Sequence, residues 1–225
     1  MKEKAVVIFS GGMDSTVCLY WAKRKFDEVE AITFQYDQKH DNEVSAAKKI
    51  CDLAKVRQKI VKLDFLPELV KSNLFQGQGN VNELNEKELP SSFVPNRNQL
   101  FITLAHAYAQ KIGAKHLVTG VCQTDYSGYP DCRESFIKLI QLTTNEGSQE
   151  NILIHTPLMH LDKAQTFDYA EGLGCYSVVM NLSQTCYNGD KTINAWGKGC
   201  GKCPACKLRE NGWKKFKKRC GIKWE

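Results

Sequence analysis

A run of small, hydroxyl-bearing residues follows the first apolar segment of the chain. Residues 5–9 are apolar and lead directly into SGGMDST at residues 10–16, after which a helical pattern begins. Glycines let a backbone come close to an anion, and the unbonded N–H groups at a helix start point towards it. The hydroxyls add donors, and Asp14 carries a carboxylate of the kind that binds magnesium. The run therefore predicts a cradle for phosphate groups.

Three cysteines near the end of the chain have the spacing of a metal site. Cys200, Cys203 and Cys206 stand at C-x2-C-x2-C intervals, and Cys186 is the nearest candidate for a fourth ligand. Four thiolates around one zinc ion form a closed, structural site. An iron–sulfur cluster uses similar spacing and stays an alternative. Cys220 is a poorer fourth ligand, because it would lie about four turns further along a helix.

Composition is that of a globular protein, with 42% hydrophobic and 25% charged residues. The net charge of +6 lies in the tail from Lys207 onward, which predicts a solvated helix face or a contact with nucleic-acid phosphates. No leader pattern or membrane-length apolar run is seen, so a cytoplasmic location is expected. The remaining cysteines before the tail are interpreted as small buried side chains; they are Cys18, Cys51, Cys122, Cys132 and Cys175.

Strand and helix patterns alternate along the chain, which predicts an α/β fold with a doubly wound parallel sheet. We expect a sheet domain over residues 1–180 and a zinc-binding loop with a closing helix over 181–225. The expected strands are 4–9, 29–34, 58–63, 115–121 and 151–156. The expected helices are 14–25, 43–53, 97–112, 133–142, 163–173 and one from about residue 204. Residues after Gly174 are expected to form an irregular, cysteine-rich loop.

Polar segments follow the predicted strands, where ligands bind in such sheets. They cover residues 10–16, 35–40, 122–133 and 157–163, and we expect them to converge on one site. The long polar stretch from 66 to 94 is predicted to be a substrate lid.

Two polar segments offer groups that could recognise an acidic heterocycle. Residues 125–133 combine aspartates, aromatic rings and Arg133, while residues 93–98 add a phenylalanine and Arg97. An aspartate can accept two N–H bonds from a guanine-like edge, and an arginine suits a carboxylate or phosphate. The alternatives are an ordinary polar loop and a surface arginine in a first helical turn.

The run at residues 10–15 resembles the pyrophosphatase loop of the N-type ATP pyrophosphatases. From residue 8 to about 209, the chain resembles one family among them, the 7-cyano-7-deazaguanine synthases. Three positions depart from the pattern typical of that family: Asp37 and Asn96 stand where glycine is usual, and Cys122 where asparagine is usual. The segments that carry the resemblance are SGGMDS (10–15), FVPNRN (93–98), SGYPDCR (127–133), TPLMHLDKA (156–164), TCYNG (185–189) and CGKCPACKLR (200–209).

The resemblance implies an adenine nucleotide alpha-hydrolase-like, Rossmann-like fold. It implies an ATP-dependent carbon–nitrogen ligase that converts 7-carboxy-7-deazaguanine and ammonia into the nitrile through adenylated intermediates, in queuosine biosynthesis. Mg²⁺ is expected with ATP, and one structural Zn²⁺ in each chain. A homodimer is expected, with no membrane and no direct need for nucleic acid.

The roles implied for individual residues fall into four groups. Asp14, Ser15 and Lys163 are predicted to be catalytic. The ATP-binding residues are predicted to be Ile8, Phe9, Ser10, Gly11, Gly12, Met13, Asp14, Ser15, Thr16, Val17 and Cys18. The substrate-binding residues are predicted to be Phe93, Arg97, Asp125, Tyr129, Asp131 and Arg133. The metal ligands are predicted to be Cys186, Cys200, Cys203 and Cys206.

Two other functions stay open at this point. A tRNA-thiolating ATP pyrophosphatase shares the loop at residues 10–15, could use the basic tail, and could use Cys122 or Cys132 as a reactive thiol. A non-catalytic RNA or protein adaptor could retain the nucleotide fold and a zinc knuckle. ATP consumption stimulated by tRNA would favour the first, and tight tRNA binding without pyrophosphate release would favour the second.

Overall fold

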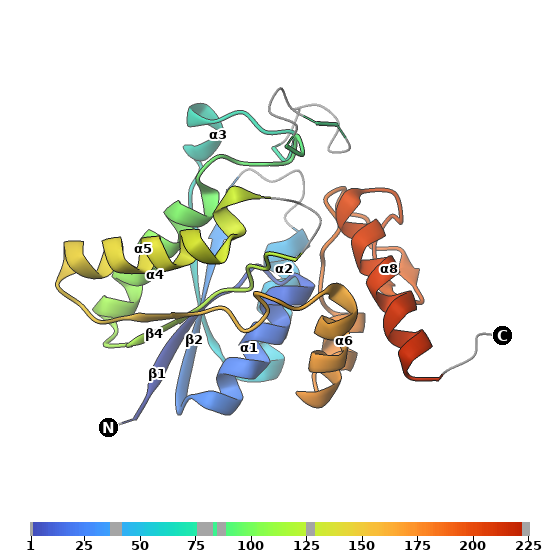
Figure 1. Cartoon of the computed structure of the whole chain (residues 1–225), viewed down its shortest axis with the longest axis horizontal. Coiled ribbons are helices and arrows are strands. Elements are labelled where there is room, and N and C mark those ends of the chain that lie inside the picture. Colours follow the sequence, from blue (N-terminus) through green and yellow to red (C-terminus); the bar gives the residue numbers. More distant parts are fainter. Residues whose placement is uncertain (1, 37–41, 76–82, 85–88, 125–128, 222–225) are drawn as a thin grey trace.

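A computed structural model describes residues 2–36, 42–75, 83–84, 89–124 and 129–221 of the 225-residue chain. Over these ranges the main sheet has five parallel strands in the order β3-β2-β1-β4-β5, which confirms the doubly wound parallel sheet (Figure 1). The strands are β1 (Lys4–Ile8), β2 (Glu28–Gln35), β3 (Arg57–Lys62), β4 (His116–Val118) and β5 (Leu153–His155).

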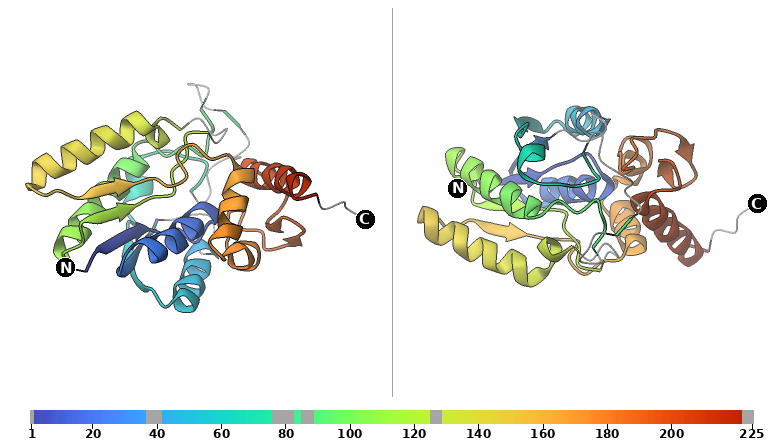
Figure 2. Two further views of the ribbon diagram at one scale, coloured as in Figure 1. Left: turned by 60° about the horizontal axis from the view of Figure 1, so that its bottom comes forward. Right: turned by 90° about the horizontal axis from the view of Figure 1, so that it is seen from above.

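Helices cover both faces of the sheet (Figure 2). Side chains alternate along β1: Ala5 and Val7 belong to one hydrophobic cluster, and Val6 belongs to the other. The first cluster packs against α1 (Met13–Lys25), α2 (Asn42–Ala54), α6 (Lys163–Gly172), α7 (Tyr176–Asn181) and α8 (Pro204–Arg219). The second packs against α4 (Arg97–Lys111) and α5 (Glu134–Ser148). Short elements complete the described fold: α3 (Leu66–Leu69), the 3₁₀ turn η1 (Pro130–Cys132), β6 (Ile193–Asn194) and β7 (Gly197–Lys198).

Several helix boundaries follow from local chemistry. Asp162 accepts the N–H of Gln165 at 2.8 Å, and the Gln165 side chain accepts the N–H of Asp162 at 2.8 Å, so the two residues form a capping box at the start of α6. Gly113 ends α4 with a φ of 70°. Asn96, which stands where glycine is usual, precedes α4 with a φ of 57°. Asparagine tolerates this left-handed conformation better than most side chains, so the backbone can keep the shape that glycine would give it.

Two sequence-based expectations were wrong. The fourth strand ends at Val118 rather than near residue 121, because the chain turns towards the start of α1. A Cβ on Gly120 would lie 3.1 Å from the backbone of Asp14 and Ser15, so this segment packs on the helix instead of extending the strand. The segment after Gly174 is not an irregular loop throughout: it contains α7 and the β6–β7 hairpin. Both elements are too short for their periodicity to stand out in the sequence.

The C-terminal helix α8 packs on the same core as α1 and α6. The rings of Phe216 and Phe167 stack at 5.8 Å, and Trp213 donates its indole N–H to the hydroxyl of Tyr176 at 3.1 Å.

The division of the chain at residue 180 stays a prediction. The substrate lid over residues 66–94 also stays a prediction, because 76–82 and 85–88 lie outside the described residues. Among the helices that the structure describes, none is long and apolar enough to cross a membrane.

Candidate active site

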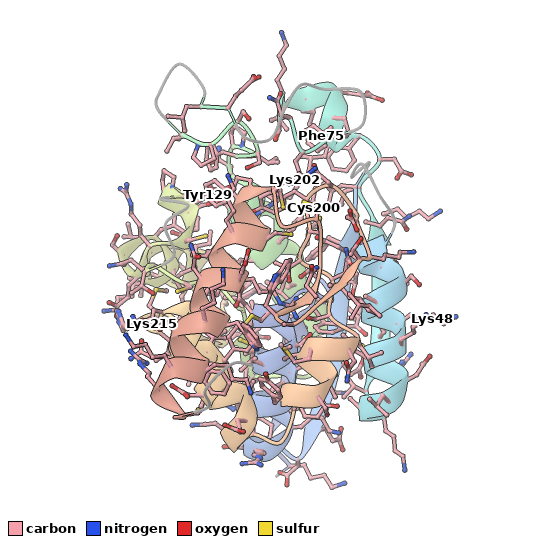
Figure 3. All side chains as sticks on the ribbon, turned by 90° about the vertical axis from the view of Figure 1, so that its right-hand side faces the viewer. Lys48, Phe75, Tyr129, Cys200, Lys202 and Lys215 are labelled. Carbon is pink, nitrogen blue, oxygen red and sulfur yellow. The ribbon has the colours of Figure 1, made fainter. Side chains whose placement is uncertain are left out.

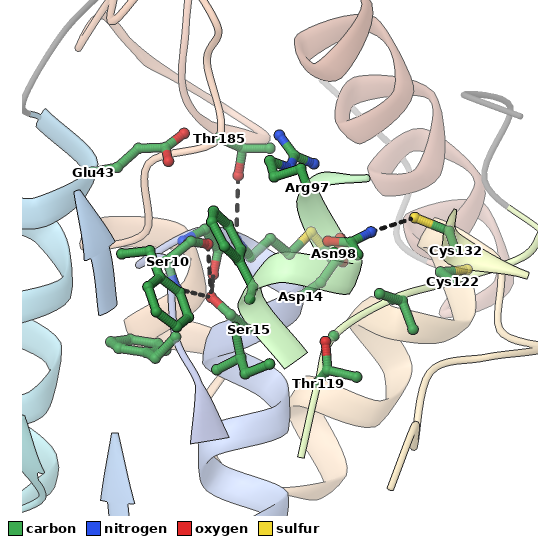
Figure 4. A pocket seen from close by; sticks show the side chains of 18 of the residues that line it. Ser10, Asp14, Ser15, Glu43, Arg97, Asn98, Thr119, Cys122, Cys132 and Thr185 are labelled. Carbon is green, nitrogen blue, oxygen red and sulfur yellow. Dashed lines mark hydrogen bonds between the residues drawn. The ribbon is translucent and has the colours of Figure 1, made fainter. Parts of the chain in front are cut away.

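A cavity of about 260 Å³ opens at the carboxyl ends of β1 and β4, where the order of the strands reverses (Figure 4). This is the point at which open α/β sheets bind ligands. The chain reaches the cavity from several segments that lie far apart in sequence. Its lining includes parts of residues 8–15, 34–36, 43–44, 97–101, 119–122, 129–132 and 184–187.

The glycine-rich run forms a compact turn at one end of this cavity. Gly11 has a φ of 85°, and a Cβ there would lie 2.7 Å from backbone atoms of α2, so another residue does not fit. The hydroxyls of Ser10 and Ser15 lie 3.1 Å apart, and Ser10 Oγ accepts the N–H of Gly12 at 3.2 Å. Hydroxyl donors and the start of α1 therefore face the same space, as a phosphate site requires.

Asp14 and Lys163 form an ion pair beside this turn. The ammonium of Lys163 donates to both carboxylate oxygens of Asp14, at 2.7 and 2.6 Å. The side chain of Lys163 is 6% exposed and that of Asp14 is 26% exposed, so water screens the pair weakly. Gly212 of α8 makes room for Lys163, because a Cβ at this glycine would lie 2.3 Å from the Cβ of the lysine. Both residues were predicted to be catalytic, and the structure places them together.

The other end of the cavity holds an arginine among tyrosines. Arg97 donates to the hydroxyl of Tyr36 at 3.3 Å, and Tyr36, Tyr129 and Tyr187 all line the cavity. Burial works against the charge of Arg97, but the nearby oxygens of Tyr36, Tyr187 and Asp131 raise its pKa above the usual value. Burial also raises the pKa of Tyr187, so this phenol stays neutral. A permanent cation beside aromatic rings suits a planar, anionic ligand.

The four predicted metal ligands come together near the start of α8. The sulfur atoms of Cys186, Cys200, Cys203 and Cys206 all lie within 4.8 Å of one another. Figure 3 shows Cys200 at the same end of the molecule as Tyr129 of the cavity. Hydrogen bonds from Cys203 and Cys206 hold the pKa of Cys186 well below its ordinary value, and the same contacts raise the pKa of Cys206. One thiolate is thus stabilised by neighbouring thiols, and the donor set and spacing fit a tetrahedral metal ion.

Comparison with known proteins identifies the family. The family described as "Queuosine biosynthesis protein QueC" matches residues 4–217. The chain is 48% identical to the 7-cyano-7-deazaguanine synthase of Helicobacter pylori (strain P12) over 219 residues, covering 96% of each chain. It is 46% identical to that of Bacillus subtilis (strain 168) over 215 residues, covering 96% of this chain and 95% of the relative. The chain belongs to the QueC family, that of the 7-cyano-7-deazaguanine synthases.

Solved structures share the fold of this QueC-family chain. A 4-thiouridine synthetase, crystallised as an RNA complex with bound ATP, matches with a TM-score of 0.54 and 20% identity, over 96% of this chain and 50% of that one. NMN synthetase from Francisella tularensis matches with a TM-score of 0.50 and 14% identity, over 100% of this chain and 89% of that one. These matches show that the α/β fold predicted from the sequence is shared with both solved structures.

The predicted ATP-binding residues of this QueC-family chain divide into two groups. Gly11, Thr16, Val17 and Cys18 do not line the described cavity, and the last three are buried in the core or on its edge. The residues of this set that line the cavity are Ile8, Phe9, Ser10, Gly12, Met13, Asp14 and Ser15. The residues that line the cavity can contact a bound nucleotide directly. The other residues of the set hold the turn in place.

The predicted substrate-binding residues are also divided. Arg97 and Tyr129 line the cavity. Phe93 packs its ring on Tyr129 at 5.4 Å, while Arg133 is exposed at the start of α5 and is not part of the lining. Asp131 is buried, and its carboxylate accepts the N–H of Asn98 at 3.0 Å, which ties η1 to the first turn of α4. Asp125 lies outside the described residues.

Gln184 and Thr185 line the cavity but were not predicted from the sequence, whereas Tyr36 lies in the polar segment 35–40 that was expected to reach the site. The cysteine spacing points to Cys186 in this segment, but no spacing rule points to the polar residues before it. The interpretation of Cys122 and Cys132 as core residues was incomplete, because both line the cavity. Cys122 lies 3.0 Å from the carbonyl oxygen of Leu161. By contrast, Cys18, Cys51 and Cys175 are core residues as predicted.

Proposed function

We propose that this chain converts 7-carboxy-7-deazaguanine, ammonia and ATP into 7-cyano-7-deazaguanine. The observation that carries the proposal is the cavity with a phosphate-binding turn at one end and Arg97 among tyrosines at the other. It lies in a chain that is 48% identical to curated 7-cyano-7-deazaguanine synthases over 96% of its length.

The chemistry explains why both ends are needed. A carboxylate does not react with ammonia at neutral pH, because its oxygen is a poor leaving group. Attack of a carboxylate oxygen on the α-phosphorus of ATP forms an acyl-adenylate and releases pyrophosphate. Ammonia then displaces AMP to give the amide. Transfer of a second adenylyl group to the amide oxygen, followed by loss of AMP and two protons, leaves the nitrile.

Charge stabilisation at the glycine-rich turn would assist the release of pyrophosphate. The hydroxyls of Ser10 and Ser15 and the N–H groups at the start of α1 are the donors nearest this end of the cavity. Lys163 can pass from the carboxylate of Asp14 to a phosphate oxygen, which leaves Asp14 available to a cation. Mg²⁺ bound with the nucleotide would neutralise charge that develops on the phosphate oxygens.

At the other end, Arg97 would hold the substrate carboxylate while the tyrosine rings contact the heterocycle. Positioning of the two reactants, rather than a protein nucleophile, supplies most of the acceleration in this scheme.

The four cysteines would hold a structural Zn²⁺ that takes no part in a chemical step. Four thiolates leave no open position for a substrate, so such an ion stabilises the turn before α8. Measurement of metal content should give one zinc per chain, and much less in the Cys206→Ser variant. The homodimer and the cytoplasmic location stay predictions.

The direct test incubates metal-replete protein with ATP, Mg²⁺, ammonium and 7-carboxy-7-deazaguanine, with product masses determined after chromatography. The nitrile is expected, with AMP and pyrophosphate as co-products, and omission of ammonium should stop its formation. A parallel incubation with tRNA and a sulfur donor tests the thiolation alternative, which the exposure of Cys122 and Cys132 to the cavity makes worth including. Pyrophosphate release that depends on tRNA and not on the acid would refute the proposal.

A further inference from the structure

Gln184 and Thr185, which precede the predicted metal ligand Cys186, are hydrogen-bonded to the turn at residues 10–16, called the phosphate turn. The N–H of Gln184 donates to the carbonyl oxygen of Gly11 at 2.9 Å. The hydroxyl of Thr185 accepts the N–H of Met13, in the first turn of α1, at 3.3 Å (Figure 4). Thr185 also lines the cavity, and a Cβ on Gly12 would lie 3.9 Å from its oxygen. A side chain from the C-terminal region thus stands at the end of the cavity that faces phosphate.

A buried arginine holds this threonine from the other side. Arg209 of α8 is 1% exposed and donates from Nη1 to the hydroxyls of Thr185 and Ser183, at 3.2 and 3.1 Å. Its other nitrogens donate to the carbonyl oxygens of Trp196 and Val179, at 3.0 and 2.8 Å. Arg209 lies one helical turn after Cys206, so the four-cysteine region sets its position.

These contacts fix the direction of the Thr185 hydroxyl. A hydroxyl has two lone pairs and one hydrogen. Met13 and Arg209 both donate to Thr185, and among the described residues these are its two hydrogen bonds. Both lone pairs are thereby occupied, so the hydroxyl has only its hydrogen left to offer to a ligand in the cavity. A hydroxyl in this state can donate to a phosphate oxygen and cannot accept.

Arg209 also contributes positive charge near the turn. Within the described part of the chain, the four groups that accept its hydrogen bonds are neutral, while the carboxylate of Asp14 acts on the guanidinium through space. Burial lowers the pKa of Arg209 to about 10, which still leaves it protonated at pH 7. A buried charge is screened less by water than an exposed one, and the sign of this charge favours an anion in the cavity.

We propose that Thr185 is a further phosphate-binding residue of this site and that Arg209 is a positioning residue that orients its hydroxyl. The inference rests on the proposed function, because it assigns a contact to the pyrophosphate portion of ATP. It also gives the four-cysteine region a part in nucleotide binding, because the helix that starts at these cysteines carries the arginine that orients a phosphate donor.

Calorimetric titration with ATP, inorganic pyrophosphate and AMP, each with Mg²⁺, tests this assignment. Thr185→Val keeps the shape of the side chain and removes the hydroxyl, so ATP and pyrophosphate should bind about tenfold more weakly, as expected for one lost charge-assisted hydrogen bond. AMP should bind within about twofold of the wild-type protein by the same reasoning, since it lacks the pyrophosphate portion. Thr185→Ser should restore the affinity for pyrophosphate.

Ser183→Ala is the matched control. Ser183 accepts from the same nitrogen of Arg209 as Thr185 does, but it is fully buried and does not line the cavity. This variant should bind pyrophosphate within about twofold of the wild-type protein. Arg209→Lys should weaken pyrophosphate binding, and its effect should not add to that of Thr185→Val, because both remove the same donor.

Three results would decide against the inference. Equal or tighter pyrophosphate binding by Thr185→Val would overturn it, as would an equal loss of AMP binding. Additive effects of Thr185→Val and Arg209→Lys would exclude the positioning role. If Arg209→Lys does not fold, as judged by thermal melting, the threonine variants still decide the main claim. Failure of the wild-type protein to bind ATP would instead refute the proposed function itself.

Discussion

The two ends of the cavity are built in different ways. The end proposed to bind phosphate, called the phosphate end, is mostly one contiguous run, in which Ser10, Gly12 and Ser15 are hydrogen-bonded to one another within six residues. The end around Arg97 is assembled from tyrosines at positions 36, 129 and 187, which follow three different elements. The hydrogen bonds of the phosphate end form between residues that are close in sequence. The contacts around Arg97 form only after the sheet has brought distant segments together.

This difference predicts separate kinetic effects. Changes in the phosphate turn should affect every step that uses ATP, whichever acid is offered. Changes around Arg97 should affect the acid and leave ATP binding intact. A variant at one end that changed both ATP binding and the KM for the acid would show that the two ends act as one unit.

The largest effect is expected at Asp14. Asp14→Asn keeps the size of the side chain but removes the charge that pairs with Lys163. Loss of an electrostatic group at a reacting centre lowers kcat by about 10²- to 10³-fold, and pyrophosphate release with a coupled assay measures it. Thermal melting confirms folding.

The control for Asp14 is Lys215→Met, which removes an exposed ion pair with Asp162 at the surface. It should leave pyrophosphate release close to the wild-type rate, because exposed pairs contribute little. A folded Asp14→Asn variant with near wild-type turnover would remove this residue from the phosphate end.

The next largest effect is expected at Gly11. Gly11→Ala places a methyl group 2.7 Å from the backbone of α2, at a φ of 85° that alanine disfavours. The turn must then shift, and we expect kcat/KM for ATP to fall about 10²-fold, the size of effect that a misplacement of about 1 Å can cause.

Gly147→Ala is the matched control for Gly11→Ala, since a Cβ there, in α5, meets nothing within 4 Å. It should raise the free energy of unfolding by up to about 1 kcal/mol, because alanine favours a helix more than glycine does. If Gly11→Ala retained full kcat/KM, the contiguous run would be less strictly built than the structure indicates.

A smaller and more selective effect is expected at Arg97. Arg97→Met should raise KM for 7-carboxy-7-deazaguanine by about 10- to 100-fold, the size of a lost hydrogen bond to a charged group. The dissociation constant for ATP alone should not change. Steady-state kinetics with each substrate varied in turn separates the two parameters.

Arg133→Met is the matched variant for Arg97→Met. Arg133 was predicted from the sequence to contact substrate, yet it is exposed and absent from the described cavity lining. A smaller change in KM than for Arg97→Met is expected. An equal change would extend the acid-binding end towards the start of α5.

The same contrast explains what the sequence could predict. The turn at residues 10–16 and the cysteine spacing are local patterns, and the structure confirms the turn and the assembly of the four cysteines. Arg209 and Thr185 were not predicted, because their importance lies in contacts with residues more than 20 or 170 positions away. No spacing rule in a single sequence reports such contacts.

The smallest effect is expected at a histidine pair that does not line the cavity. His116 and His155 share a hydrogen bond of 3.1 Å between ring nitrogens, and the rings of Trp21 and Phe26 lie against His155. Burial lowers the pKa of His155 to about 4, and the charges of His116 and Lys25 act in the same direction, while Glu3 opposes them.

Because the folded protein holds His155 neutral, its stability should fall with acidification. The unfolded chain takes up this proton near pH 6.5, so stability is lost as the pH decreases from about 6.5 towards 4. After allowance for partial exposure we expect a loss of about 1 to 2 kcal/mol, measured as the free energy of unfolding in urea at pH 7 and pH 5. His155→Phe should reduce this loss, while His160→Gln, at an exposed position, should not.

Neither His155 nor His160 lines the cavity, so KM values at pH 7 should be unchanged in His155→Phe and in His160→Gln. An altered KM for ATP in His155→Phe would show that the edge of the sheet influences the phosphate end, and the separation of the two ends would then be incomplete.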